Sequence, residues 1–246
     1  MSGHSKWSTI KRKKGANDAQ RAKIFTKIAR EISVVVREGG PDPDNNSRLR
    51  DVIGKARSAN MPNDNIQRTI KKAAGDNDGA VYESIIYEGY GPKGVAVIVE
   101  TLTDNRNRTA GDVRHYFDKF GGNLGQNGCV SYMFDRKGVI ELERTESINE
   151  DDLMMCALEA GADDVSADEE EFEVETTPEM FQQVRDALEK AGYSFDSAQI
   201  SYVPQTMVAL EDEKDVLFMN KLIEALEDND DVQNIYHNWD APSEEE

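Results

Sequence analysis

The chain has 246 residues, of which 38% are hydrophobic and 31% are charged, and its net charge at neutral pH is −19. No apolar run approaches the roughly 20 residues of a membrane-spanning helix, and the polar, basic start lacks the apolar core of a secretory signal. Two cysteines and three widely separated histidines supply neither a disulfide framework nor the spacing of a metal site. We therefore expect a cytoplasmic protein with no membrane contact, no metal and no cofactor.

The charge is divided sharply along the chain. Residues 1–74 hold 17 Lys and Arg against 7 Asp and Glu, whereas the remaining 12 Lys and Arg face 41 Asp and Glu. Solubility alone does not explain this division, because net charge of either sign keeps a protein soluble. The basic part is interpreted as a surface for polyanions, above all nucleic acid, and the acidic part as a region that limits non-specific binding.

A basic arm begins the chain. It combines dense positive charge with one aromatic ring and has no helical or strand periodicity: Lys6, Trp7, Lys11, Arg12, Lys13 and Lys14. This pairing is typical of segments that neutralise phosphates while a base stacks on the ring. The alternative is a solvated arm whose Trp7 packs on the neighbouring helices, since basic runs are common on protein surfaces.

Three short helices are predicted to follow as a small bundle. The first begins after a cap at Asn17, ends at residues 39–41, and has an apolar stripe with helical period: Phe25, Ile28, Ile32 and Val36. Basic side chains project from its opposite side: Lys23, Lys27, Arg30 and Arg37. A second helix over about residues 47–60 is expected to bury Leu49, Val52, Ile53 and Ala56, and a third carries Ile66 and Ile70.

Strands mixed with helices are predicted beyond a linker at residues 76–79. Residues 84–88 and 94–101 form two expected strands. A helix is expected to begin near Thr109, because residues 109–112 have the form of a capping box, and to end at the glycines 121 and 122. Residues 130–134 are predicted to form another strand.

The order of elements from residue 139 onward is βαββαβ, the ferredoxin-like order. It is predicted from strands and helices at residues 139–143, 150–160, 164–166, 172–175, 178–191 and 198–203. A strand, a helix and a strand then follow at residues 207–210, 215–226 and 232–238, and would complete the group of elements that starts at residue 84.

The expected fold class is therefore α+β, with an N-terminal three-helix bundle followed by two α/β domains, the third inserted into the second. The predicted boundaries are 1–75 for the helical domain, 80–135 plus 204–240 for the middle domain, 136–203 for the inserted ferredoxin-like domain, and 241–246 for an acidic tail.

Six ordered motifs are spread over nearly the whole chain: GHSKW at residues 3–7, KIFTKI at 23–28, YEGYGP at 87–92, DNRNRT at 104–109, GGNLG at 121–125 and YMFDRKG at 132–138. Together they resemble the YebC/PmpR family. The resemblance implies three domains, the third inserted into the second. It also implies a DNA-binding transcriptional regulator, although mitochondrial relatives are translational activators and bacterial relatives are linked to the ribosome and to relief of stalling.

Arg106 and Arg108 form a second candidate site. They are expected just before a helix, whose first-turn N–H groups and dipole favour anions, and arginine binds phosphate in a bidentate way. The alternative is a loop in which Asp104 and Asn105 turn the chain and the arginines pair with neighbouring acids.

Other polar clusters are interpreted as structural. His115 lies near Asp104 in sequence, but no nucleophile accompanies them, so a solvated or capping histidine is expected. The acid runs at 168–171 and 227–231 lack the ligand order of a calcium loop, and both are expected to be solvated faces.

These observations predict a non-enzymatic regulator of gene expression that binds nucleic acid and has no small-molecule substrate. The leading hypothesis is a DNA-binding transcriptional regulator, and the alternative is a translation factor that binds ribosomal RNA or the ribosome. No helix-turn-helix pattern is recognised, so the sequence does not support base-specific reading of DNA. Backbone contacts are expected from the basic arm and from Lys23, Lys27 and Arg30, with Arg106 and Arg108 as a second point of attachment.

Overall fold

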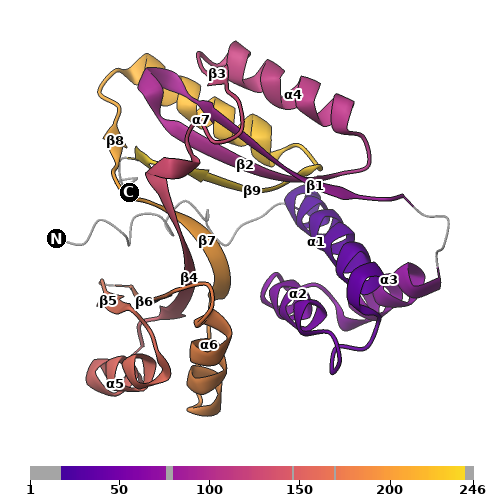
Figure 1. The fold of residues 1–246 in the computed structure, drawn as a ribbon, viewed down its shortest axis with the longest axis vertical. Helices are drawn as coiled ribbons and strands as arrows, with labels where there is room; N and C mark the ends of the chain where they lie inside the picture. Colours follow the sequence, from indigo (N-terminus) through magenta and orange to yellow (C-terminus); the bar gives the residue numbers. More distant parts are fainter. Residues whose placement is uncertain (1–17, 76–79, 146, 169, 242–246) are drawn as a thin grey trace. The chain divides into compact units, whose positions relative to one another are not determined.

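The structure is a computed structural model that describes residues 18–75, 80–145, 147–168 and 170–241. The described chain forms two compact units (Figure 1). One is Met133–Thr206, and the other combines the described residues before Met133 with Met207–Trp239. The predicted basic arm, the linker at 76–79 and all but the first residue of the predicted acidic tail lie outside the described residues.

The first three helices pack around a hydrophobic core of their own: α1 (Asp18–Gly39), α2 (Ser47–Ser58) and α3 (Asn63–Gly75). The four apolar residues predicted for α2 are all buried, as are Ile66 and Ile70 of α3. In α1 the buried stripe differs from the predicted one at two positions. Val35 is buried in addition to Val36, and Phe25 is only partly buried. The helical period in the sequence therefore predicted the core of this bundle correctly.

Asn46 explains how α2 follows α1. Its side-chain Oδ1 accepts a hydrogen bond from the Leu49 N–H at 3.1 Å and so caps α2. Its Nδ2 donates to the main-chain oxygens of Val35 at 2.8 Å and Gly40 at 2.9 Å, near the end of α1. One buried amide thereby satisfies polar groups at two helix ends, which would otherwise lose their water partners without replacement.

The same unit contains a four-stranded antiparallel sheet in the order β3-β1-β2-β9. Its strands are β1 (Glu83–Tyr90), β2 (Ala96–Thr103), β3 (Asn123–Leu124) and β9 (Val232–His237). A short 3₁₀ turn, Pro92–Gly94, joins β1 to β2. Figure 1 shows helices α4 (Arg106–Lys119) and α7 (Glu213–Glu227) side by side over this sheet. β8 (Val208–Ala209) pairs separately with β10 (Trp239–Asp240).

Two expectations for this part of the chain are wrong. Helix α4 begins at Arg106, because Asn105 rather than Thr109 caps it; Asn105 Oδ1 accepts from the Arg108 N–H at 3.1 Å. The strand predicted at residues 130–134 is a 3₁₀ turn, Ser131–Met133, that leads into β4 at Phe134.

Glu88 on β1 holds the loop before that turn. Its side chain is buried, and its carboxylate accepts from three main-chain N–H groups, of Gly128 at 2.7 Å, Val130 at 2.9 Å and Ser131 at 2.8 Å. Burial by itself raises the pKa of Glu88, but these hydrogen bonds outweigh it and the pKa is lowered. The carboxylate therefore remains charged and fixes the path of a loop that the sequence pattern misassigned.

The second unit has the predicted ferredoxin-like order: β4 (Phe134–Glu143), α5 (Glu150–Ala160), β5 (Asp164–Ala167), β6 (Glu171–Thr176), α6 (Phe181–Lys190) and β7 (Ser197–Pro204). Its sheet has the order β5-β6-β4-β7, with every neighbouring pair antiparallel. Alternate residues such as Ile140, Leu142 and Val174 pack against the two helices. Within the described ranges, no helix in either unit has the length and apolar character needed to span a membrane.

Several of the other residues of β4 and β6 carry carboxylates. Glu141 of β4 lies directly opposite Glu173 of β6, and both side chains are buried. Burial, together with the neighbouring charges of Glu175, Glu141 and Glu171, raises the pKa of Glu173 to about 7. This face of the sheet therefore contains an acid that takes up its proton near neutral pH.

β9 follows β4–β7 in the chain but pairs with β2, so the ferredoxin-like segment interrupts the sequence of the first sheet. This arrangement is the one expected for an insertion. The assignment of residues 1–75 to a domain separate from the middle domain stays a prediction, since α1–α3 belong to the same compact unit as the first sheet.

Candidate functional site

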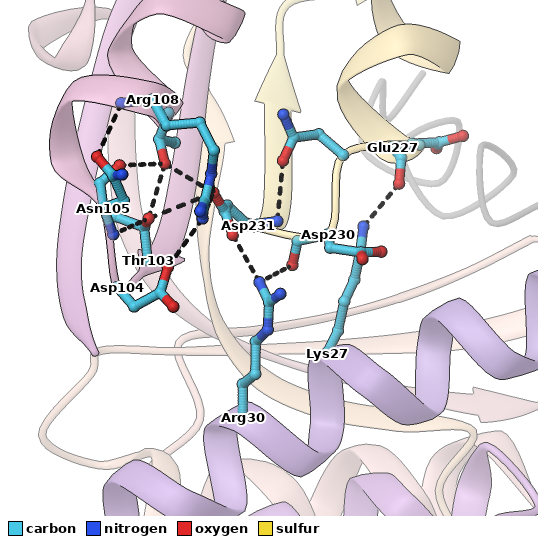
Figure 2. A network of polar contacts seen from close by, with 11 residues as sticks. Lys27, Arg30, Thr103, Asp104, Asn105, Arg108, Glu227, Asp230 and Asp231 are labelled. Atoms are coloured by element: carbon cyan, nitrogen blue, oxygen red, sulfur yellow. Dashed lines mark hydrogen bonds and ion pairs between the residues drawn. The ribbon is translucent and has the colours of Figure 1, made fainter. Parts of the chain in front are cut away.

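Five of the cations predicted to bind nucleic acid lie in the described part of the chain. Lys23, Lys27 and Arg30 are on α1, and Arg106 and Arg108 are in the first turn of α4. The six predicted residues of the basic arm, Lys6, Trp7, Lys11, Arg12, Lys13 and Lys14, lie outside it. Four of the five described cations contact residues 227–231, from the end of α7 to the start of β9, which we call the acidic turn. Figure 2 shows three of them, Lys27, Arg30 and Arg108.

Asp231, the last residue of the acidic turn, is the centre of this site. Its side chain is only 4% exposed, and both carboxylate oxygens accept hydrogen bonds. Oδ1 accepts from Arg30 Nη1 at 2.7 Å. Oδ2 accepts from Arg108 Nη2 and from Thr109 Oγ1, each at 2.7 Å. One buried carboxylate therefore joins α1 to α4, and it is compensated by two guanidinium groups.

Local structure brings these groups together. β2 ends at Thr103, whose hydroxyl accepts from the Asn105 N–H at 2.9 Å, and Asn105 then caps α4. The Leu102 N–H donates to the main-chain oxygen of Asp231 at 2.7 Å. The end of β2, the start of α4 and the acidic turn therefore share one point, and the side chains of Thr103 and Asp231 face each other there.

The three cations of α1 lie in a row along the acidic turn, and each has an acceptor there. Each donates to one of its oxygens at 2.7 Å: Lys23 to the Asp228 carboxylate, Lys27 to the Glu227 main-chain carbonyl, and Arg30 to the Asp230 main-chain carbonyl. Figure 2 shows Lys27 and Arg30 rising from α1 toward these acceptors. The side of α1 that the sequence predicted to be basic is therefore directed at an acidic segment of the same chain.

The electrostatics agree with this arrangement. Burial by itself raises the pKa of Asp231, but hydrogen bonds from Arg108, Thr109 and Arg30 outweigh it and the pKa is lowered. Burial lowers the pKa of Lys27, against the opposing effect of the neighbouring acids. The hydrogen bond to Asp228 raises the pKa of Lys23. The site is thus a network of ion pairs around Asp231, whose side chain is almost fully removed from solvent.

An open cleft of about 470 Å³ lies beside this network. It is lined by Lys23, Arg30, Asp104, Arg108, Asp112, Asn229 and the acids 228, 230 and 231. Five carboxylates therefore face three cations across the cleft. That balance is unfavourable for a phosphate group, so the cleft as it stands does not fit a polyanion.

Arg106 and Arg108 have different environments. Arg108 pairs with Asp104 at 2.9 Å as well as with Asp231, which is the structural alternative considered for it from the sequence. Arg106 is exposed at the first position of α4. Nucleic-acid binding by either residue stays a prediction, and Arg106 is the better placed of the two to bind a ligand.

Sequence reasoning missed the central residue. Asp231 belongs to an acid run that was expected to form a solvated face, and that expectation is wrong for Asp231, whose side chain is buried. Thr103, also buried, was not predicted to take part, and Thr109, buried as well, was predicted only as a helix cap. The sequence does indicate that Asp231 is near the core, because a short polar turn between a helix and a buried strand places its last residue at the edge of the core. Its partners, however, are distant in sequence, and only the folded structure identifies them.

Further cations of the bundle are exposed. On α3, Arg68, Lys71 and Lys72 are all exposed to solvent. Positions separated by three and four residues are neighbours on one helix face. Together with Arg57 on α2, these side chains are basic groups of the bundle that are directed to solvent.

Comparison with known proteins connects these observations to a family. A family model described as the TACO1/YebC protein N-terminal domain matches residues 5–76, and one described as the TACO1/YebC second and third domain matches residues 82–239. A crystal structure of a conserved hypothetical protein from Aquifex aeolicus is 49% identical in sequence and has a TM-score of 0.85, covering 97% of this chain and 98% of that chain.

Relatives of high identity carry one name. A probable transcriptional regulatory protein of Acetivibrio thermocellus is 64% identical over 97% of this chain and 99% of its own length. One of Ruminiclostridium cellulolyticum is 61% identical over 100% of this chain and 99% of its own length. Because the two family models match nearly the whole chain in order, this chain belongs to the TACO1/YebC family.

Proposed function

We propose that this chain is a non-enzymatic, cytoplasmic regulator of gene expression that binds nucleic acid through its basic N-terminal part. The observation that carries the proposal is the division of charge: residues 1–74 hold an excess of ten cations, while the rest of the chain is strongly acidic. A cationic surface releases counterions when it binds a phosphate backbone, and this release supplies most of the affinity of non-specific binding.

The proposed contacts fall into two groups. The first is the basic arm, whose five cations and Trp7 combine phosphate neutralisation with stacking. The second is the solvent-exposed basic face of α3, where Arg68, Lys71 and Lys72 are neighbours, with Arg106 of α4 as a further attachment. Lys23, Lys27, Arg30 and Arg108 are proposed as contacts that first have to leave their partners within the chain.

The proposed ligand is DNA in the leading form of the hypothesis, which the names of the relatives favour. Ribosomal RNA is the second candidate. It is favoured because the exposed basic groups offer phosphate contacts, whereas the sequence contains no recognised element for reading bases in the major groove.

The test is a salt titration with the full chain. Fluorescence anisotropy of labelled duplex DNA and of labelled RNA gives the binding constant as salt is raised. Replacing Lys11, Arg12, Lys13 and Lys14 by Gln removes up to four phosphate contacts, so the log–log slope should become shallower by about 3. The matched control replaces four exposed lysines elsewhere, Lys119, Lys190, Lys214 and Lys221, by Gln, and should keep the wild-type slope. Equal slopes for the two variants would contradict the proposal.

A second experiment separates DNA from ribosomal RNA. A transcriptional regulator prefers its sites over bulk duplex by roughly 10³-fold or more. A ribosome-associated factor instead sediments with ribosomes through a density gradient and leaves them at high salt. A reproducible promoter footprint without ribosome sedimentation would decide for transcription, and the converse result would decide for translation.

A further inference from the structure

We propose that Lys23, Lys27 and Arg30 form a polyanion-binding surface on α1, and that the acidic turn occupies this surface as an internal substitute for phosphate groups. Nucleic acid and the acidic turn then compete for this surface, and the exchange takes place at its outer cations, Lys23 and Lys27. The inference rests on the proposed function, because it names how the nucleic-acid surface is regulated.

The first argument is the spacing of the cations. They lie at positions i, i+4 and i+7 of one helix and span roughly 10 Å along its axis, since a helix rises about 1.5 Å per residue. Three side chains in a row on one face can follow a chain of anionic groups. This arrangement is more than a single ion pair needs.

The second argument is what the acidic turn presents to them. All of its acceptors are oxygens, namely the carboxylates of Asp228 and Asp231 and the main-chain carbonyls of Glu227 and Asp230. Glu227 is the last residue of α7, and carbonyls at a helix C-terminus carry the negative end of the helix dipole. The acidic turn therefore offers α1 a row of negative oxygens, as a phosphate backbone does.

The third argument is that the solvent exposure of the contacts decreases from one end of the row to the other. At one end Asp228 is 65% exposed and its partner Lys23 is 39% exposed, and exposed ion pairs of this kind are weak and screened by salt. At the other end Asp231 is only 4% exposed and is also held by Arg108. The outer contacts can exchange with phosphates at little cost, while the inner contact keeps α1 attached.

Neutralising the outer acids tests the competition. In the full chain, the double substitution Asp228→Asn and Asp230→Asn should tighten binding to random-sequence duplex DNA or single-stranded RNA about tenfold, because a competitor that holds the surface about nine-tenths of the time lowers apparent affinity by that factor. The matched control is Asp118→Asn with Glu211→Gln, which removes two exposed acids of the same unit and should change affinity less than about twofold.

A double-mutant cycle assigns the gain to α1. In a chain that also carries Lys23→Gln and Lys27→Gln, neutralising Asp228 and Asp230 should no longer tighten binding, since the released cations are absent. A gain that persists in this background, or one that the control reproduces, would overturn the proposal. If the wild-type chain binds neither probe at low salt, the proposed function fails instead, so the two failures are distinguishable.

A direct readout is zero-length carbodiimide crosslinking, which joins an amine to a carboxylate only where they are in contact. Lys23 Nζ lies 2.7 Å from Asp228 Oδ1, so mass spectrometry should detect this crosslink in the full chain. Saturating duplex DNA or single-stranded RNA should abolish it, while the Lys55–Glu31 crosslink within the bundle, where the groups are 2.9 Å apart, serves as the internal control. Retention of the Lys23–Asp228 crosslink at saturation would refute the competition.

Discussion

Replacing Asp231 by Ala should destabilise the unit that contains α1, α4 and α7. The change leaves the Arg30 guanidinium partly buried without its carboxylate and removes one of the acceptors near the buried Thr109 hydroxyl. Loss of one partner from a buried ion pair typically costs about 3–5 kcal/mol. Arg108 keeps Asp104 and its side chain is 46% exposed, so we expect the lower end, about 3 kcal/mol.

The assay is urea unfolding followed by fluorescence of Trp239. This tryptophan is buried in the same unit, and a Trp7→Phe background removes the other tryptophan of the chain. For a domain of this size, about 3 kcal/mol corresponds to a fall of roughly 6–12 °C in the melting temperature. The control is Asp228→Ala, whose exposed side chain should contribute less than about 0.5 kcal/mol.

The pH dependence has a defined sign. The folded-state pKa of Asp231 is lowered, so its contribution is fully present above the unfolded value of about 3.9 and is lost as the pH falls through the folded value. The difference in the free energy of unfolding between wild type and Asp231→Asn should therefore be constant near neutral pH and shrink below about pH 4. If Asp231→Ala were no less stable than Asp228→Ala, the reasoning about the buried network would be refuted.

Three further predictions follow from other residues. Glu88→Ala should lower the free energy of unfolding by about 2–3 kcal/mol in the same fluorescence assay, because it leaves three main-chain N–H groups of the 128–131 loop without their acceptor; a change below about 0.5 kcal/mol would contradict this. The raised pKa of Glu173, about 7, means that the Met133–Thr206 unit should lose stability as the pH rises from about 5 to 8, and Glu173→Gln should remove about 2 kcal/mol of that loss in unfolding followed by circular dichroism; an unchanged pH profile in the variant would refute the assignment. Arg108→Ala should destabilise its unit by about 1–2 kcal/mol while the exposed Arg106→Ala changes stability by less than about 0.5 kcal/mol, and thermal melts that rank the two in the opposite order would reverse their roles.

The pattern of apolar residues in the sequence was sufficient to predict those parts of the fold that depend on local sequence alone. All four residues predicted for the core of α2 are buried, because an apolar stripe with helical period has only one way to leave water. The βαββαβ order likewise predicted the topology of the second unit. Each strand–helix–strand connection turns in one preferred hand, and this rule leaves few possible orders for four strands. These parts of the fold follow from patterns a few residues long.

Periodicity failed where two local solutions compete. Asn105 and Thr109 are both suitable helix caps, and the sequence pattern favoured Thr109. In the folded chain Asn105 caps α4, and Thr109 instead donates to Asp231 from inside the first turn. The hydroxyl of Thr109 therefore has a partner more than a hundred positions away, and no local pattern contains that contact.

The same limit applies to the candidate site. Composition alone establishes that the N-terminal part is basic and the rest acidic, because charge is a property of each residue wherever it lies. Composition does not determine whether Arg30 faces solvent or Asp231. A hydrogen bond acts only when donor and acceptor are about 3 Å apart, and it is folding that brings residues 30, 108 and 231 to that distance. The sequence therefore accounts for the sign of the surface, and the packing of α1 against the acidic turn accounts for which of its cations already have a partner.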